Sequence, residues 1–293
     1  TYVGGLVSRA AGATLINCTS YATVYAAGSA GEIPYPRVGG LAAEGHTFIN
    51  CTNYGSVKAN PDSSGFSSPG GYGAGGIACM ARVMIGCANY GSVVAGGQAG
   101  GVVGEISCYG STEEKPVGVM VGCANYGTVE AREWAGGLAG DAEGIMEDCY
   151  NLGTVKVEKT KAGGLVGRNE TSGTIDHSTS RAMVSGAYAT GGIVGYNLGV
   201  ITGCTNVGAV NSEYQESALD MEGLPATLLE LVKKDMGDDL SNNISNVSSD
   251  TGGIAGRSSG LILSSANAGD VGFAHVGYNV GGIVGRTDGL ISG

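Results

Sequence analysis

Apolar residues occur along this chain in short segments of three to six residues, which are rich in Val and Ile and are cut by glycines. An α-helical repeat would need longer amphipathic runs, because glycine is unfavourable in a helix interior. Short β-branched segments bounded by glycine are typical of strands joined by tight corners. The pattern therefore predicts many short β-strands.

Two phrases alternate along the sequence. The first reads Φ-x-x-C-x-N-x-G-x-V, where Φ is apolar, and the second is a glycine pair followed by two apolar residues. The shortest spacing between Cys positions is 26 residues. The Cys position falls at Cys18, Cys51, Cys87, Cys123, Cys149 and Cys204, with serine at Ser178 and Ser265. The glycine pair begins at Gly4, Gly39, Gly75, Gly100, Gly136, Gly163, Gly191, Gly252 and Gly281.

Repeats of this size that are made of short strands stack into a solenoid, in which each coil buries its inward residues against its neighbours. The two phrases predict an all-β fold, a parallel β-solenoid of eight or nine coils that we expect to be right-handed. Residues 1–293 would form a single domain. Because stacked strands lie ~4.8 Å apart, nine coils would make a rod about 40 Å long.

Each position of the first phrase has an expected role. The apolar position before the Cys, the Cys itself and the closing Val should point inward. The Asn should bond to the backbone at a corner and stack on its equivalents as an amide ladder, and the glycine two residues later should take a positive φ. The predicted inward positions are Leu15, Phe48, Met84, Met120, Met146, Ile175, Ile201 and Ile262, with Val24, Val57, Val93, Val129, Val155, Val184, Val210 and Val271.

One stretch resembles a known repeat family. The phrase AGGLVG at residues 162–167, which follows CYNLGTV at residues 149–155, is similar to the Glug-motif repeat. Glug repeats occur in secreted and surface proteins of bacteria, including the non-catalytic region of immunoglobulin A peptidases. The resemblance covers the chain except for about 211–250, and it implies a repeat architecture and a surface location. The peptidases' zinc motif, H-E-x-x-H, does not occur in this sequence, so no proteolytic role is implied.

Composition and charge mainly exclude classes of protein and of partner. The chain has 56 glycines but no G-X-Y period, which excludes a collagen-like protein. With 42% apolar and only 14% charged residues, the chain is also too apolar to be disordered. The net charge of −11 predicts no nucleic-acid partner, because no basic stripe is available to neutralise phosphates. No apolar run is long enough to span a bilayer, so we expect no membrane insertion.

Reactive side chains show no catalytic or metal-binding spacing. His46, His177 and His275 are far apart, and neither a C-x-x-C pair nor a nucleophile elbow occurs. We predict no cofactor, no metal and no catalytic residue. The eight cysteines are either free buried thiols or disulfides, and the parallel directions of stacked equivalents favour free thiols. Cys79 and Cys108 lie outside the repeated position and are the exceptions expected first.

Insertions interrupt the coils mainly at one junction, between the closing Val and the next glycine pair. This gap is 7 residues in the short coils but 15 after Val24, 18 after Val57 and 42 after Val210. Three of the four large insertions should therefore leave the same corner of the rod, and inserted segments often carry function. The insertion 211–250 contains LPATLLELVKKDMG and is predicted to include one short amphipathic helix.

Aromatic residues mark two groups of candidate ligand contacts. One group lies in the first two corner insertions, and the other is a tyrosine ladder, which begins at Tyr21, three residues after the Cys position. The ladder has two interpretations, mutual ring stacking that stabilises the coils or a carbohydrate-binding stripe. The candidate ligand contacts are Tyr35, Phe66, Tyr72, Tyr54, Tyr90 and Tyr126.

These features favour a non-catalytic module of a bacterial cell-surface or secreted protein. It would be a spacer or adhesin-like rod that presents loops to a host protein or a carbohydrate. Both ends fall within a repeat, so we expect the segment to belong to a longer chain. The alternative is a polysaccharide-acting β-helix enzyme, a lyase or glycosidase, which would need carboxylates converging on one face. Asp141, Glu143, Glu147 and Asp148 are near one another in sequence, although such a cluster is more often a solvated face.

Overall fold

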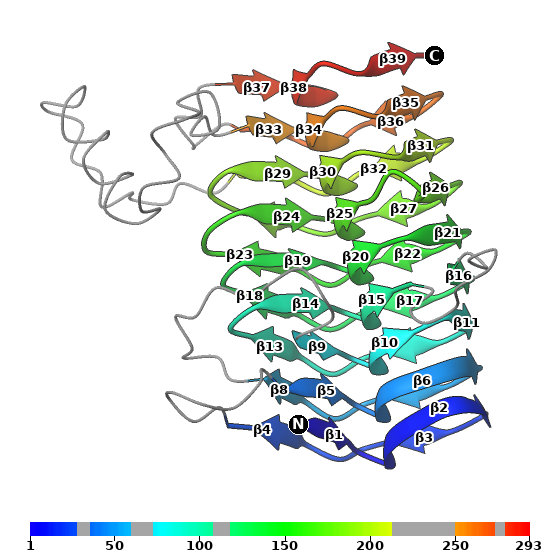
Figure 1. Ribbon diagram of the computed structural model, residues 1–293. Coiled ribbons are helices and arrows are strands. Elements are labelled where there is room, and N and C mark those ends of the chain that lie inside the picture. The colour runs from blue at the N-terminus through cyan, green and yellow to red at the C-terminus, as the bar shows by residue number, and fades with distance from the viewer. Residues whose placement is uncertain (28–35, 60–72, 108–117, 213–249, 273–278) are drawn as a thin grey trace, which may run out of the picture.

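The computed structural model describes residues 1–27, 36–59, 73–107, 118–212, 250–272 and 279–293. Within these ranges every regular element is a β-strand, and the strands pair in parallel. The coils form a straight stack with the two termini at opposite ends (Figure 1). The predicted all-β parallel solenoid is therefore confirmed. The helix expected within 211–250 falls on 213–249, outside the described residues.

Sheet A contains the strand that ends on the first glycine of each glycine pair. We number the coils 1 to 9 by its nine strands, which agrees with the predicted eight or nine coils. Its strands are β1 (Tyr2–Gly4), β5 (Arg37–Gly39), β9 (Gly73–Gly75), β14 (Gln98–Gly100), β19 (Trp134–Gly136), β24 (Lys161–Gly163), β29 (Ala189–Gly191), β33 (Asp250–Gly252) and β37 (Asn279–Gly281).

Sheet B has 16 strands in two arms, which join because β2 and β6 run continuously through both. The first arm follows the glycine pair and contains β2 (Val7–Ile16), β6 (Ala42–Ile49), β10 (Ala78–Ala81), β15 (Val103–Ile106), β20 (Ala139–Ala142), β25 (Val166–Asn169), β30 (Val194–Asn197), β34 (Ala255–Ser258) and β38 (Val284–Thr287). The second arm adds β11 (Val83–Ile85), β16 (Gly118–Val121), β21 (Gly144–Glu147), β26 (Thr174–Asp176), β31 (Val200–Thr202), β35 (Leu261–Leu263) and β39 (Leu290–Ser292).

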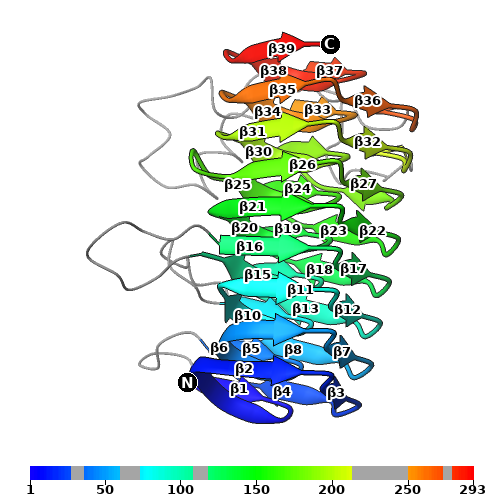
Figure 2. The same cartoon turned by 90° about the vertical axis from the view of Figure 1, so that its right-hand side faces the viewer.

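Along the chain, sheet C follows the second arm of sheet B in coils 1 to 8, and sheet D follows sheet C in coils 1 to 6 (Figure 2). Sheet C carries the Asn of the first phrase, or serine in its place on β3 and β27, and its strands are β3 (Thr19–Ser20), β7 (Thr52–Asn53), β12 (Ala88–Asn89), β17 (Ala124–Asn125), β22 (Tyr150–Asn151), β27 (Thr179–Ser180), β32 (Thr205–Asn206) and β36 (Ala266–Asn267). Sheet D carries the closing Val on β4 (Val24–Ala26), β8 (Val57–Ala59), β13 (Val93–Ala95), β18 (Val129–Ala131), β23 (Val155–Val157) and β28 (Val184–Ser185).

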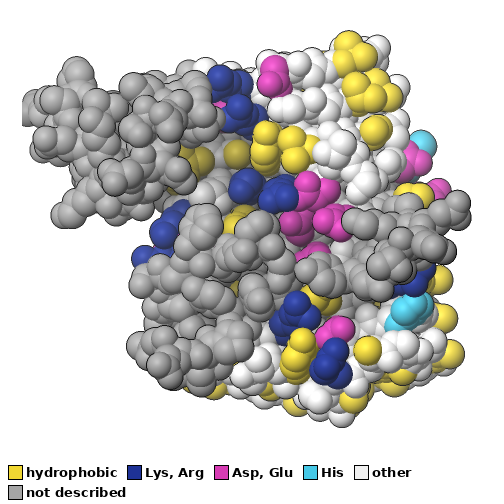
Figure 3. Space-filling model, viewed as in Figure 1, with side chains coloured by type: hydrophobic (Ala, Val, Ile, Leu, Met, Phe, Trp, Pro, Cys, Tyr) yellow, Lys and Arg dark blue, Asp and Glu magenta, His cyan; other side chains and the backbone are white. Residues whose placement is uncertain are grey.

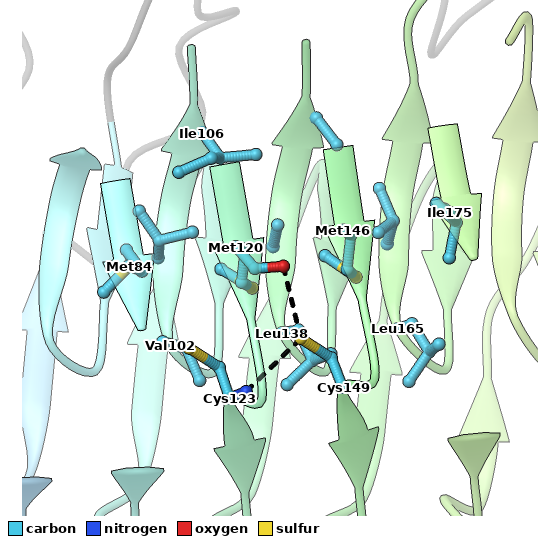
Figure 4. Packing of buried hydrophobic residues seen from close by; sticks show 14 of the residues in the cluster. Met84, Val102, Ile106, Met120, Cys123, Leu138, Met146, Cys149, Leu165 and Ile175 are labelled. Carbon is cyan, nitrogen blue, oxygen red and sulfur yellow. Dashed lines mark hydrogen bonds between the residues drawn. The ribbon is translucent and has the colours of Figure 1, made fainter. Parts of the chain in front are cut away.

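Two hydrophobic cores run along the rod. The larger core lies within the two arms of sheet B and includes the Cys position (Figure 4), and the smaller core lies between sheets A and D. Leu15, Val271 and, at the Cys position, Cys18 and Ser265 are only partly buried, whereas the other predicted inward positions are buried. In the larger core, the fully buried predicted positions are Phe48, Met84, Met120, Met146, Ile175 and Ile201.

A column of buried asparagines lies at the inner edge of sheet C. Asn53, Asn89 and Asn125 each donate from Nδ2 to Oδ1 of the next Asn at 2.8 to 2.9 Å. Each Nδ2 also donates to the carbonyl oxygen of the glycine two residues later. In coil 6 serine replaces the Asn, and there Asn151 Nδ2 donates to Gly164 O at 2.7 Å instead. The predicted amide ladder is confirmed.

The amide column explains why the second residue of the glycine pair must be glycine. A Cβ built on Gly101, the second glycine of its pair, would lie 2.4 Å from Asn125 Cγ and 2.0 Å from Gly137 O. The corresponding glycines of the neighbouring coils meet their own asparagines in the same way. The backbone of the glycine pair therefore touches the amide column across the middle of each coil, and this contact separates the two cores.

The expected positive φ lies at a different residue. The glycine two positions after the Asn is absent from the positive-φ residues, so that prediction was wrong. Gly91, for example, is required by close approach, because its Cβ would lie 1.9 Å from Gly55 O. The left-handed residue is the one immediately before the Cys position, with φ between 41° and 61°, and it is most often Asn, Asp or Gly, which tolerate this conformation. These residues are Asn17, Asn50, Gly86, Gly122, Asp148, His177, Gly203 and Ser264.

The described cysteines are free thiols, as the parallel stacking predicted. In the repeated position Cys149 Sγ donates to Glu147 O at 3.2 Å and accepts from Cys123 N at 3.3 Å. Ser178 makes the equivalent bonds through its hydroxyl, which explains why serine alternates with cysteine. Burial raises the pKa of the Cys204 thiol to about 12, so this group stays protonated at neutral pH. Cys79 is also free and buried, and Cys108 lies outside the described residues.

A second, shorter amide column was not predicted. Asn169 at the end of β25 donates to Asn197 Oδ1 at 2.8 Å, and Asn197 donates to Ser258 Oγ at 3.1 Å. All three side chains are fully buried. This column runs along the first arm of sheet B through coils 6 to 8.

Two glycine substitutions in coil 4 should have opposite outcomes. Gly101→Ala places a methyl group against backbone and Asn125, and we expect the free energy of unfolding to fall by ~3 kcal/mol or more. Gly122→Asn should be tolerated, because Asn17 and Asn50 occupy the equivalent position and nothing lies within 4 Å of its Cβ. Urea unfolding followed by circular dichroism measures both. Equal destabilisation of the two variants would contradict the contact described here.

Candidate functional site

Segments outside the description join the rod mainly at one corner. Four of the five such segments, 28–35, 60–72, 213–249 and 273–278, connect the sheet D position of a coil to the next strand of sheet A. The fifth, 108–117, connects the two arms of sheet B. The common corner predicted from the gap lengths is therefore confirmed by the described strands on either side. Tyr35, Phe66 and Tyr72 lie outside the described residues.

A cavity of about 290 Å³ lies beside this corner, where sheet D ends at β28. Lys156 to Glu158 and Met183 to Ala187 line it together with Asn211 and Ser212. Asn211 holds the corner of coil 7 closed, because its Nδ2 donates to Gly186 O at 3.1 Å and to Thr251 Oγ1 at 3.0 Å. The 213–249 segment therefore leaves the rod from a position fixed by side-chain hydrogen bonds.

The tyrosine ladder is present in coils 1 to 4. The rings of Tyr21, Tyr54, Tyr90 and Tyr126 stack with centroids 4.5 to 5.0 Å apart and interplanar angles of 2° to 12°. Tyr126 ends the stack, where its hydroxyl donates to the Tyr150 hydroxyl at 3.4 Å. This bond raises the pKa of Tyr126 to about 12, because it is lost when the phenol ionises. The exposed fraction is 76% at Tyr21 and falls to 38% at Tyr126.

The stacking limits which parts of the tyrosine rings can contact a ligand. Neighbouring rings cover each other's faces, so a sugar ring cannot stack on Tyr54 or Tyr90 as it would on an isolated aromatic platform. The hydroxyls and ring edges point outward. Mutual stacking therefore explains the ladder as a stabilising feature, and any ligand contact at Tyr54, Tyr90 and Tyr126 would involve edges and hydroxyls.

A charged face occupies the middle of the rod, over sheet A and the first arm of sheet B (Figure 3). Glu105, Asp141 and Arg168 pair in register on β15, β20 and β25. Beside them, Trp134 and Lys161 pair in register on β19 and β24, with Lys161 Nζ 5.1 Å from the centre of the indole ring. The face therefore brings carboxyl groups, cations and the single tryptophan of the chain together.

Ion pairs lie at the edges of this face, whereas two buried polar atoms at its centre lack a hydrogen-bond partner. Arg168 pairs with Glu170, and Lys159 Nζ lies 3.2 Å from Glu133 Oε1. Asp141 Oδ1 and Trp134 Nε1 are sealed from solvent without a hydrogen-bond partner. Such unsatisfied groups lower stability rather than raise it.

Burial shifts the ionisation of the central groups. It raises the pKa of the Asp141 carboxyl from 3.8 to about 7, opposed by the Arg168 guanidinium and reinforced by Glu105 and Glu143. The pKa of Glu105 is also raised, again mainly by burial. Burial lowers the pKa of Lys161, with a smaller contribution from the Arg168 charge. At neutral pH the Asp141 carboxyl is therefore only partly ionised, and burial disfavours the charged forms of Glu105 and Lys161 as well.

Asp141 and Glu147, which were grouped in sequence, are separated in space, whereas Glu143 stays close enough to Asp141 to raise its pKa. Asp141 belongs to the charged face on β20, whereas Glu147 ends β21 on the second arm of sheet B. Glu105 was missed because it lies in another coil. A signal for it was present, because Glu105, Asp141 and Arg168 each lie five residues after the first glycine of their pairs. Counting from the glycine pair instead of the Cys would have aligned them.

The other reactive residues do not converge. His46 contacts Thr47 Oγ1 at 2.8 Å and Arg82 at 3.3 Å, and His177 lies 2.7 Å from Asp176 Oδ1. His275 lies outside the described residues. Among the residues that the structure places, no three His, Cys, Asp or Glu side chains are grouped to hold a metal ion. In the same ranges no helix is long and apolar enough to cross a membrane.

Comparisons of this chain with protein-family models, with curated proteins and with solved structures found no match.

The tyrosine stack predicts a difference between two substitutions at Tyr90. Tyr90→Ala removes an inner ring, and we expect the free energy of unfolding to fall by ~1 to 2 kcal/mol. Tyr90→Phe keeps the ring and should change it by less than ~0.5 kcal/mol. Thr128→Ala, at an exposed position of the next coil, is the control in the same urea titration. Equal stability of the Ala and Phe variants would show that the stacking contributes nothing.

Asp141 predicts a pH dependence of stability. The pKa of Asp141 is about 7 in the folded protein and lies above its unfolded value, so folding favours the protonated carboxyl. The contribution of this group to the free energy of unfolding is therefore fully present only below about pH 4. As the pH rises through 7 this contribution is lost, and the free energy of unfolding falls by at most ~4 kcal/mol. Asp141→Asn should flatten the unfolding free energy between pH 4 and pH 8, with exposed Glu147→Gln as the control. An unchanged pH profile in Asp141→Asn would refute the assignment.

Proposed function

We propose that this chain is a non-catalytic repeat module of a bacterial cell-surface or secreted protein. It acts as a spacer or adhesin-like rod that presents segments for contact with a host protein or a glycan. One observation carries the proposal, the attachment of four variable segments at the same corner of an otherwise regular rod. The resemblance to Glug repeats supports the surface location.

The geometry of the rod suits this role. The corner segments 28–35 and 60–72 leave neighbouring coils 1 and 2, and 213–249 and 273–278 leave neighbouring coils 7 and 8. In coils 3 to 6 the same connection is short, as between Ala95 and Gln98. The rod therefore holds two groups of segments about 25 Å apart, because five intervals of ~4.8 Å separate coil 2 from coil 7. Tyr35, Phe66 and Tyr72 are the proposed contacts in the first group.

Burial argues against the enzyme alternative. Glu105 and Asp141 lie on neighbouring strands, an arrangement in which two carboxyl groups could serve a glycosidase. Glu105 is only 7% exposed, however, and Asp141 Oδ1 is sealed from solvent. Asp141 is partly exposed, but both carboxyl groups of a glycosidase must reach the substrate, so the burial of Glu105 favours a structural role for this pair.

An array of host matrix proteins and glycans tests the proposal. Replacing 60–72 by two glycines, as at residues 96 and 97 of coil 3, should abolish binding to at least one host matrix protein that the intact chain binds on the array. The same replacement of 108–117, which joins the rod elsewhere, is the matched control and should bind normally. A reducing-end assay on the same glycans should show no cleavage. Cleavage, or no binding by the intact chain, would reject the proposal.

A further inference from the structure

The tyrosine stack is the centre of a wider strip of hydroxyl groups. Serine or threonine follows each of three stacked tyrosines two residues later, and two threonines precede the first two tyrosines by two residues. All of these residues are at least partly exposed. Ser92 Oγ donates to Ser56 Oγ at 3.0 Å, so the neighbouring hydroxyls are close enough to share one ligand. This hydroxyl strip consists of Tyr21, Tyr54, Tyr90, Tyr126, Ser56, Ser92, Thr128, Thr19 and Thr52.

The hydroxyl strip carries no formal charge. Its polar groups are phenols and aliphatic hydroxyls, and the exposed charges of Lys58 and Glu130, which follow the strip along coils 2 and 4, belong to sheet D. Each hydroxyl can both donate and accept a hydrogen bond. Such a surface matches a ligand whose own groups are hydroxyls, and it offers nothing to balance the charge of an acidic or basic partner. The matching chemistry is that of a neutral saccharide.

The repetition of the strip also indicates the shape of the ligand. Sheet C pairs in register through these coils, so the same hydroxyl pattern recurs at each rung along the rod axis. A ligand with its own repeat can bind several rungs at once, which raises affinity without any strong single contact. The strip ends after coil 4, where the tyrosine position becomes Leu152, then Arg181 and Val207.

We propose that the hydroxyl strip binds a neutral oligosaccharide chain that lies along the rod over coils 1 to 4. This inference deepens the proposed function and rests on it, because it adds a saccharide site to a module that binds rather than cleaves. The saccharide contacts phenol hydroxyls and ring edges, since the ring faces are covered by stacking. Tyr21, at 76% exposure, is the ring with the most accessible surface at the end of the strip.

The test removes the hydroxyls and keeps the rings. In the triple variant Tyr54→Phe, Tyr90→Phe, Tyr126→Phe the stack should persist, so a loss of affinity reports on recognition and not on folding. Calorimetric titration uses neutral hexasaccharides of glucose, mannose, xylose and N-acetylglucosamine. We expect at least one to bind the intact chain and to bind the triple variant more than tenfold more weakly, since each lost hydrogen bond weakens binding severalfold.

Two further variants serve as a second probe and a control. Ser92→Ala removes a hydroxyl next to the stack and should weaken the same saccharide by a smaller factor. Tyr196→Phe removes a phenol hydroxyl from the charged face, where the ring packs against Arg257, and should leave affinity unchanged. Circular dichroism and urea midpoints of all variants confirm that the fold is retained.

The outcomes separate this inference from the proposed function. If no neutral hexasaccharide binds, or if the triple variant binds as tightly as the intact chain, the hydroxyl strip is not a saccharide site. Binding that survives in the triple variant but is lost when 60–72 is replaced would overturn this inference and leave the proposed function standing. Tighter binding of an acidic oligogalacturonate than of every neutral chain would also overturn it.

Discussion

In most coils the structure depends on the contact between a buried asparagine and the glycine pair that faces it. An amide buried at the centre of a coil must find partners for its N–H groups and its oxygen, because an unsatisfied buried group costs ~1 to 3 kcal/mol. Asn125 finds them in its own turn and in the next coil. The facing backbone must come so close that a Cβ at Gly101 would overlap the amide. The Asn and the second glycine therefore constrain each other.

This contact explains where the chain tolerates variation. The amide column, the cores and the thiol column fix the inward positions, so sequence differences collect on the outside and at corners remote from the column. The corner between sheets D and A is such a place, because the short connection from Ala95 to Gln98 lies outside the amide column. Lengthening it leaves the hydrogen bonds of Asn89 and Asn125 intact. Insertions are consequently found there in four coils.

Periodicity made the interior predictable and the surface less so. The inward apolar positions, the coil number, the amide ladder, the stacked tyrosines and the free thiols follow from residues that recur at fixed offsets from the Cys. The left-handed corner did not follow, because the residue at that position varies between Asn, Gly, Asp, His and Ser. Glu105 and Asp141 were not grouped, since only the offset from the glycine pair aligns them. The column from Asn169 was missed because too few copies carry it.

The two amide columns together affect how the rod would resist a pulling force along its axis. Where Ser180 interrupts the first column, Asn151 bonds to Gly164, and the second column starts in that same coil at Asn169 and reaches Ser258. Every junction from coil 2 to coil 8 is thus crossed by a buried asparagine bond in addition to the strand pairing. A rod pulled along its axis would therefore have to break a buried asparagine hydrogen bond at each of these junctions, supplied first by one column and then by the other.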